Sequence, residues 1–537
     1  MNAPVPFAQF AYRLHPDQRR DTPARHPVII AGAGPVGLTL AIDLAERGVK
    51  VVLLDDSDRI GDGSRAICFA KRTLEIFDGL GVAAPMLEKG VRWRIGKVFQ
   101  GEDLLYQFDL LPEPGHAMPA FINLQQFHVE KLLIDRALAL GVDLRWLNRV
   151  SGLTPMGQGA RLQVETPDGS YGLDADWLVA CDGSRSPLRA MMGLDFEGQQ
   201  FDDQFLIADV KMTAAFPVER WFWFDPPFHP GRSCLLHKQP DDIWRIDLQL
   251  SPEADAELER RPERVRPRIA RMLGHDQFDL EWVSVYRFQC RRLERFVHGR
   301  VVFAGDAAHQ VSPFGARGAN SGVQDADNLG WKLAAMLSGA PETLIESYDA
   351  ERSEAADENI LNSTRATDFI APRTRAEHLF RDAALALART QPFARRFVNS
   401  GRLSLPTAYS ASPLSTPDRD AWAGGPAPGA PAPDAPLTTP DGTPTHLLKA
   451  LGRGFTLLVQ GCEAPAGLPE GLPESLSVLR VGDGAGCWRD AEGLVARRYD
   501  AAAPAAYLIR PDGHVAARFR APDAAAITAA LHKATGS

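Results

Sequence analysis

Residues 28–56 read VIIAGAGPVGLTLAIDLAERGVKVVLLDD, and this stretch decides the fold of the first half of the chain. A short apolar strand runs into glycines at the G-x-G-x-x-G spacing, and a helix with an apolar stripe leads to a second strand. In such a βαβ unit Gly32 permits a tight turn, Gly34 lets the backbone approach a pyrophosphate, and Gly37 lets the helix pack on the strand. Asp55, at the end of the second strand, is placed to accept hydrogen bonds from a ribose diol. The sequence therefore predicts a dinucleotide site, without indicating which dinucleotide binds.

Two further apolar strands each end in an acidic residue beside a glycine. Residues 178–189 read LVACDGSRSPLR and contain Asp182-Gly183, and residues 300–334 read RVVFAGDAAHQVSPFGARGANSGVQDADNLGWKLA and contain Gly305-Asp306. Taken alone, an acid–glycine pair after a strand is usually a turn. In this order and at these distances, however, the three motifs together resemble those of the class A flavoprotein monooxygenases, the family of para-hydroxybenzoate hydroxylase and phenol hydroxylase.

The resemblance covers nearly the whole chain. Its motifs run from about Pro27 to Trp331, and the remainder is similar to the branch of phenol hydroxylase and 3-(3-hydroxyphenyl)propionate hydroxylase. It implies an α/β fold, with a Rossmann-like FAD-binding domain, an inserted antiparallel β-sheet substrate domain, a helical segment and a C-terminal thioredoxin-like domain. It also implies a monooxygenase with non-covalent FAD, transiently bound NADH or NADPH as reductant, and O₂ as oxidant. Such enzymes hydroxylate phenolic rings through a flavin C4a-hydroperoxide.

The resemblance further implies which residues contact FAD. Asp55 and the first glycine motif would hold the ADP half, and Arg65 and Gln126 would touch the diphosphate and ribityl regions. Asp182 would serve both FAD and the visiting nicotinamide, while Asp306 would bind the ribitol or a ribose. The full set of expected cofactor contacts is Gly32, Gly34, Gly37, Asp55, Arg65, Gln126, Asp182, Gly183, Gly305, Asp306, Pro313, Gly315, Arg317, Gly318, Ala319 and Asn320.

The last of these motifs carries a departure from the family pattern. Pro313 and the loop 315–320 would lie against the isoalloxazine ring, and the loop reads GARGAN where many relatives have GQGMN. Arg317 therefore either places a cation near the flavin or faces solvent. Asn320 precedes a helical run over 323–337, and a helix N-terminus aimed at reduced flavin would stabilise its negative charge.

Aromatic and β-branched segments at 205–212, 220–224, 233–238 and 243–250 predict an antiparallel sheet between the second and third motifs. Because strand side chains alternate between faces, Trp221 and Trp223 share one face and Phe222 and Phe224 the other. The sequence does not indicate which pair faces the substrate, and ordinary core packing is an alternative for each residue. The candidates for the substrate pocket are Trp221, Phe222, Trp223, Phe224, His237, Arg245, Pro313 and Phe314.

Composition shifts suggest the domain boundaries. We expect an N-terminal extension at 1–26, an FAD-binding domain at 27–200 and 285–345, a substrate sheet at 201–284, a helical segment at 346–400, a linker at 401–442 and a thioredoxin-like domain at 443–537. Because the linker is rich in proline, we expect truncation before about residue 440 to leave a folded flavoprotein. The last domain has no CxxC pair, which argues against disulfide redox chemistry.

The composition excludes several other classes of function. The net charge of −9 over 537 residues comes without a basic stripe, so we expect no nucleic-acid partner. We expect neither a membrane span nor a signal peptide, and six scattered cysteines suggest a cytoplasmic protein with reduced thiols and no metal site. We expect a small aromatic substrate as partner, and leave open whether the protein is a homodimer.

Other reactions remain open at this stage. No GxSxG, HExxH or Cys/His cluster is present, so no side chain is assigned as a catalytic group. The alternatives within flavin chemistry are epoxidation, Baeyer–Villiger oxygenation and, least favoured, halogenation. A flavin-binding sensor without turnover is the alternative from another class. The sequence selects neither the phenol nor NADH over NADPH.

Overall fold

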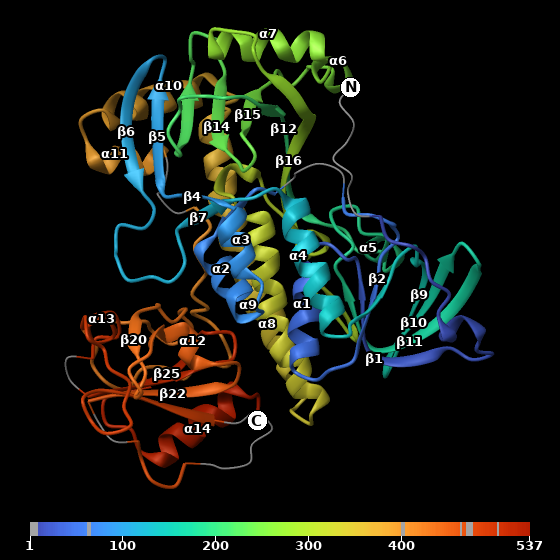
Figure 1. Cartoon of the computed structure of the whole chain (residues 1–537), viewed down its shortest axis with the longest axis vertical. Helices are drawn as coiled ribbons and strands as arrows, with labels where there is room; N and C mark the ends of the chain where they lie inside the picture. The colour runs from blue at the N-terminus through green and yellow to red at the C-terminus, as the bar shows by residue number, and fades with distance from the viewer. Residues whose placement is uncertain (1–8, 62–65, 399–402, 462–463, 469–475, 502–503) are drawn as a thin grey trace.

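The computed structural model describes residues 9–61, 66–398, 403–461, 464–468, 476–501 and 504–537 (Figure 1). Two large sheets and a smaller C-terminal domain are joined by long helices at the centre of the molecule. In the described part of the chain, no helix is both long enough and apolar enough to cross a membrane.

The first large sheet is the predicted nucleotide-binding sheet, ordered β17-β18-β11-β1-β2-β8. Its central strands are parallel, with Ile29 beside Leu178 on one side and Val52 on the other. The strands are β1 (Ala24–Ala31), β2 (Val51–Leu54), β8 (Asp143–Arg145), β11 (Gly169–Ala180), β17 (Val297–His298) and β18 (Val301–Phe303), with β9 (Arg149–Met156) and β10 (Gly159–Thr166) added beside β11. Parallel neighbours end at the same edge, so the three predicted motifs meet there.

Helices cover this sheet and connect it to a three-stranded sheet. α1 (Pro35–Glu46) packs between α4 (Gln126–Ala139) and α8 (Gly318–Leu337). The small sheet is β3 (Cys68–Ala70), β7 (Phe121–Asn123) and β4 (Val91–Trp93), and it adjoins α2 (Lys71–Gly79) and α3 (Ala83–Lys89). Short elements complete this region: η1 (Pro16–Arg19), α5 (Pro187–Met191), η2 (Gly305–Ala307) and η3 (Pro313–Gly315).

The second large sheet is wider than the segment expected from the sequence. Its order is β19-β16-β12-β15-β14-β13-β5-β6. The strands are β5 (Ile95–Gln100), β6 (Asp103–Asp109), β12 (Glu197–Lys211), β13 (Arg220–Phe224), β14 (Ser233–Lys238), β15 (Ile243–Gln249), β16 (Asp279–Arg292) and β19 (His309–Gln310). The boundary 201–284 therefore omits β5 and β6, because β5 pairs in parallel with β13 from far away in the sequence. It also cuts through β12 and β16.

The two faces of this sheet pack against different helices. One face, with Trp223 and Trp244, is buried under α7 (Pro262–Leu273), which follows the short α6 (Ala256–Glu259). The opposite face carries Phe222 and Phe224 toward α9 (Leu344–Ile370), α10 (Arg375–Ala388) and α11 (Pro392–Val398). The predicted alternation along β13 thus separates a structural face from a face that borders cavities.

The C-terminal domain is a four-stranded thioredoxin-like sheet ordered β23-β22-β24-β25. Its elements are β20 (Pro436–Thr438), β21 (Pro444–His446), α12 (Leu447–Leu451), β22 (Phe455–Gln460), β23 (Leu476–Val481), α13 (Leu494–Arg498), β24 (Ala505–Ile509), β25 (Val515–Phe519) and α14 (Ala524–Ala534). The preceding connector is packed rather than free. Gly429 donates its backbone N–H to Val515 at 2.7 Å, and Tyr409 and Leu414 are buried.

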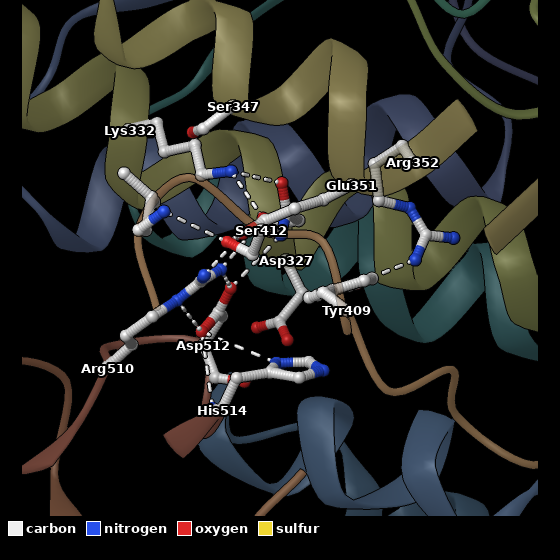
Figure 2. Close-up of polar contacts among 12 residues, drawn as sticks. Asp327, Lys332, Ser347, Glu351, Arg352, Tyr409, Ser412, Arg510, Asp512 and His514 are labelled. Atoms are coloured by element: carbon white, nitrogen blue, oxygen red, sulfur yellow. Dashed lines mark hydrogen bonds and ion pairs between the residues drawn. The ribbon is translucent and has the colours of Figure 1, made fainter. Parts of the chain in front are cut away.

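A buried charge network joins this domain to the central helices (Figure 2). Glu351 on α9 accepts hydrogen bonds from Lys332 of α8 and from Arg510, which follows β24. Asp512 pairs with Arg510 and accepts a further hydrogen bond from Asn328. The C-terminal domain therefore supplies a cation, Arg510, that pairs with a buried anion of the FAD-binding part.

Candidate active site

The three glycines of the first motif play three distinguishable roles. Gly32 has φ +105°, and a Cβ there would lie 2.4 Å from the carbonyl oxygen of Cys181. A Cβ on Gly37 would lie 2.0 Å from the carbonyl oxygen of Gly32. At Gly34, by contrast, a Cβ would meet no atom within 4 Å. Gly32 and Gly37 close the turn, and Gly34 leaves open space at the N-terminus of α1, where a pyrophosphate would be attracted.

Asp55 lies beside this turn. Its carboxylate accepts hydrogen bonds from the backbone N–H of Ala33 at 2.6 Å and of Ser57 at 2.9 Å. Burial raises its pKa to about 6, although these two N–H groups act in the opposite direction. Each carboxylate oxygen has a second lone pair, so the group can accept further hydrogen bonds from a ligand.

The second motif contains a polar atom that lacks a partner. Asp182 accepts a hydrogen bond from the backbone N–H of Leu188 at 3.0 Å, but its Oδ1 is buried and forms no hydrogen bond in the described structure. Burial raises its pKa. Such an atom normally has a donor, and the adjoining Gly183 lines the neighbouring cavity. The site therefore suits a ligand that carries hydroxyl or N–H donors.

A cavity of about 390 Å³ joins the three motifs. The predicted cofactor residues in its wall are Gly34, Gln126, Gly183, Asp306, Pro313, Arg317, Gly318, Ala319 and Asn320. The other predicted residues are not among its lining residues: Gly315 lines a neighbouring cavity, and Gly32, Gly37, Asp55, Asp182 and Gly305 lie in turns beside it. Arg65 lies outside the described residues.

Arg317 is buried and does not face solvent, which excludes that alternative. Its Nη1 donates a hydrogen bond to Asn359 Oδ1 at 3.0 Å, and Asn359 donates to Ser321 Oγ, which also accepts from Arg352. The guanidinium lines the wall of this cavity and also that of a second one. A hydrogen-bond network from α9 thus reaches the proposed flavin loop.

The helix after this loop begins earlier than the sequence suggested. α8 begins at Gly318, so Asn320 lies in the first turn instead of preceding the helix. The Asn320 amide accepts hydrogen bonds from the Ala70 backbone N–H and the Thr73 hydroxyl, and it donates to the Cys68 carbonyl. Asn320 therefore ties the loop to β3 and α2. The sequence could not show this, since the partners are about 250 residues away.

The second cavity has a volume of about 520 Å³ and shares Arg220, Arg317 and Leu403 with the first. Phe222, Phe224 and Phe314 line it, together with Phe369 from α9. Trp221 and Trp223 lie on the opposite face of the sheet, beside Phe99. The two adjoining cavities are together called the chamber here. Its helical end has mainly apolar walls but also charged residues, among them Arg365, Asp368 and Glu377, and its other end is polar beside the glycine loops.

The polar end of the chamber contains both other predicted pocket residues. Arg245 donates two hydrogen bonds of 2.8 Å to Asp209. His237 accepts a hydrogen bond from Arg220 Nε at 3.2 Å. Burial, together with the cations of Arg220 and Arg245, holds the pKa of His237 well below its ordinary value, so its imidazole is neutral.

Sequence reasoning missed two charged residues of this wall, Arg220 and Asp247. Each lies two positions from a residue that was singled out, Phe222 and Arg245 respectively, and so shares its face. The period of two would have found them. The wall contributed by the helices, by contrast, carries no comparable signal in the sequence.

The open space at Gly34, the unpaired Asp182 oxygen and the helix N-termini at the cavity all fit an FAD molecule. Among the described residues, no group of three or more metal-ligating side chains is present. Beside the glycine turns lies the chamber with its polar wall, which suits a cofactor and an organic substrate together.

Comparisons with known proteins identify the family of the chain. A family model described as an FAD binding domain matches residues 25–363, and one described as aromatic-ring hydroxylase, C-terminal, matches residues 425–537. The 12-dehydrotetracycline 5-monooxygenase/anhydrotetracycline 6-monooxygenase of Streptomyces rimosus is 32% identical, over 91% of this chain and 95% of that protein. A 3-(3-hydroxy-phenyl)propionate/3-hydroxycinnamic acid hydroxylase of Burkholderia cenocepacia is 28% identical, over 94% and 96%.

A solved structure shares the fold over the same length. The anhydrotetracycline hydroxylase of Streptomyces rimosus matches with a TM-score of 0.72 and 28% identity, covering 96% of this chain and 99% of that one. The expectation of a flavoprotein hydroxylase with a thioredoxin-like tail is thereby confirmed. The chain belongs to the family of FAD-dependent aromatic-ring monooxygenases.

Proposed function

We propose that this enzyme hydroxylates a phenolic ring that forms part of an extended, polycyclic aromatic substrate. The observation that carries the proposal is the chamber. Its polar end adjoins the glycine loops, and its mainly apolar end is a cavity of about 520 Å³ under α9–α11. Clefts and cavities of about 300–1,000 Å³ are typical for drug-sized ligands, so a single phenol would leave much of this space unfilled. The relative from Streptomyces rimosus, named for dehydrotetracycline, also favours a fused-ring substrate.

The residues of the chamber would position the substrate and exclude water. Phe222, Phe224 and Phe314 offer aromatic faces and edges against which fused rings can pack. Bound FAD, reduced by NADH or NADPH, would supply the activation of O₂. Gly34, Asp55, Asp182 and the loop after Pro313 would hold that cofactor. The apolar wall would keep solvent from the site of oxygen transfer.

A substrate panel tests the proposal. NAD(P)H oxidation would be followed with phenol, with 3-(3-hydroxyphenyl)propionate and with a monohydroxylated anthraquinone, and H₂O₂ would be measured in parallel. We expect the anthraquinone to stimulate oxidation most and to release the least H₂O₂. Its methyl ether, which lacks the activating hydroxyl, should stimulate little. Stronger stimulation by the single-ring phenols would overturn the assignment of an extended substrate.

We propose a cytoplasmic location and a homodimer as well. The five described cysteines are free thiols, as expected in a reducing compartment. Leu379, Phe380, Phe393 and Phe397 are exposed on α10 and α11, and a second copy of the chain would cover such a patch. Light scattering on the holoenzyme tests the dimer. A monomer at all concentrations would contradict it.

A further inference from the structure

Two oppositely charged side chains at the polar end of the chamber form no ion pair among the described residues. Asp247 on β15 and Arg220 on β13 both line the first cavity. Oδ1 of Asp247 is buried and accepts no hydrogen bond, and no cation among the described residues forms an ion pair with this carboxylate. Among the described residues, Arg220 donates a hydrogen bond only through Nε, to His237. Buried charges are normally paired, so this arrangement requires an explanation.

Neighbouring groups do not satisfy the two charges. Arg245 is already paired with Asp209, whose carboxylate also accepts a hydrogen bond from Gln239. Since Nε2 of His237 accepts from Arg220, the ring proton is on Nδ1, which has no hydrogen-bond partner in the described structure. The polar end of the chamber therefore offers a carboxylate, a guanidinium and an N–H donor to whatever binds there.

We propose that Asp247 accepts the proton of the substrate's phenolic hydroxyl and that Arg220 holds the resulting phenolate oxygen. The inference rests on the proposed function. In this step the O–H bond of the phenol breaks, its proton passes to a carboxylate oxygen of Asp247, and the electron pair stays on the phenolate oxygen. A phenolate is more electron-rich than a phenol, which favours electrophilic oxygen transfer to the ring.

The environment of Asp247 makes it a stronger base than an ordinary aspartate. Burial raises its pKa to about 7, Arg245 and Arg220 oppose this shift, and Asp209 adds to it. An ordinary aspartate is weaker as a base than a phenolate by about six orders of magnitude, because the pKa values are about 3.9 and about 10. With the raised pKa the difference falls to about three orders. The other titratable groups around it are His237, Cys68 and Cys234.

The pH dependence of kcat/KM tests the proposal, with the best phenol of the panel as substrate. In the wild type, kcat/KM should rise with pH through about 7, because the carboxylate form of Asp247 is required. In D247N, kcat/KM near neutral pH should fall by about 100-fold, and its rise should move to the alkaline range where the substrate ionises unaided. D279N is the matched control, since Asp279 is exposed at the start of β16, and it should keep the wild-type profile.

Two further measurements separate this role from a structural one. D247N should melt at or above the wild-type Tm, because it removes a carboxylate that forms no hydrogen bond. R220Q should raise the Kd of the phenol, measured from the flavin spectrum of the oxidised holoenzyme, more than D247N does.

Each contrary result has a distinct meaning. A D247N variant that unfolds, or that keeps the rise through about pH 7, overturns the role of Asp247 alone. If no phenol of the panel stimulates NAD(P)H oxidation by the wild type, the proposed function fails and this inference fails with it.

Discussion

Arg510 Nη2 lies 2.9 Å from Glu351 Oε2, and both side chains are fully buried. The pair links the strand–turn–strand of the thioredoxin-like domain to α9 in the FAD-binding part (Figure 2). Lys332 of α8 donates to the same carboxylate at 2.7 Å. Three segments that are distant in the sequence therefore share one buried anion.

Replacing Glu351 by glutamine should destabilise the protein by about 3–5 kcal/mol, because Arg510 and Lys332 would remain buried without their anion. Chemical denaturation of the holoenzyme measures this. The control is D135N, which breaks the exposed Lys131–Asp135 pair and should cost less than about 0.5 kcal/mol. Equal effects of the two variants would show that the buried network contributes no more than a surface pair.

The same network should make the stability of the folded protein decrease as the pH becomes acidic. Burial alone would raise the pKa of Glu351, but Arg510 and Lys332 outweigh it and hold the pKa well below its ordinary value. A lowered carboxyl pKa contributes stability that is complete above the unfolded-state value of about 4.3 and is lost as pH falls below it. Tm should therefore fall more steeply below about pH 4.3 in the wild type than in E351Q. Parallel curves would contradict this.

The glycines of the first motif should separate folding from cofactor binding. Gly34→Val places a side chain in open space, so the variant should fold and lose FAD. Gly37→Val forces a side chain against the carbonyl of Gly32, so it should destabilise the fold itself. Circular dichroism and flavin content after purification measure the two effects. A folded Gly34→Val protein with normal FAD would remove this glycine from the cofactor site.

The two aromatic pairs of β13 should likewise separate an effect on the substrate pocket from an effect on stability. Replacing Phe222 and Phe224 by alanine enlarges the chamber, so more H₂O₂ should be released per NAD(P)H consumed. Replacing Trp221 and Trp223 removes packing on the opposite face, near α7. The change at the buried Trp223 should cost about 3–5 kcal/mol, and the change at the half-buried Trp221 should cost less. The ratio of product formed to NAD(P)H consumed, measured in the stable variants, shows which pair lines the substrate pocket. Unchanged coupling in the phenylalanine variant would remove this face from the substrate site.

The parts of the fold that follow from local pattern were predictable from the sequence. The glycine spacing and the alternation along β13 are set by neighbours in the chain, and both appear in the structure. The pairing of β5 with β13 was not predictable, because it joins strands about 120 residues apart and neither strand carries a mark of its partner. The choice of face along β13 likewise depends on helices that follow much later in the chain.

The connector shows the limit most clearly. Its proline content favours a flexible linker, which led to the expectation that truncation before residue 440 leaves a folded flavoprotein. The buried contacts argue against this, because truncation would remove Arg510 from Glu351 and would expose Trp331, which packs against Phe455. The composition of a segment indicates how flexible it would be in isolation. It does not indicate which other residues pack against it.

Isotope labelling tests the central claim most directly. The holoenzyme would be supplied with NAD(P)H, the best phenol of the panel and isotopically labelled O₂, and the product would be analysed by mass spectrometry and NMR. We predict that the product gains one labelled oxygen atom as a new hydroxyl on an intact aromatic ring. A labelled oxygen inserted into a ring as an ester or lodged in an epoxide, or no labelled oxygen in any product, would contradict assignment of this protein as an aromatic hydroxylase.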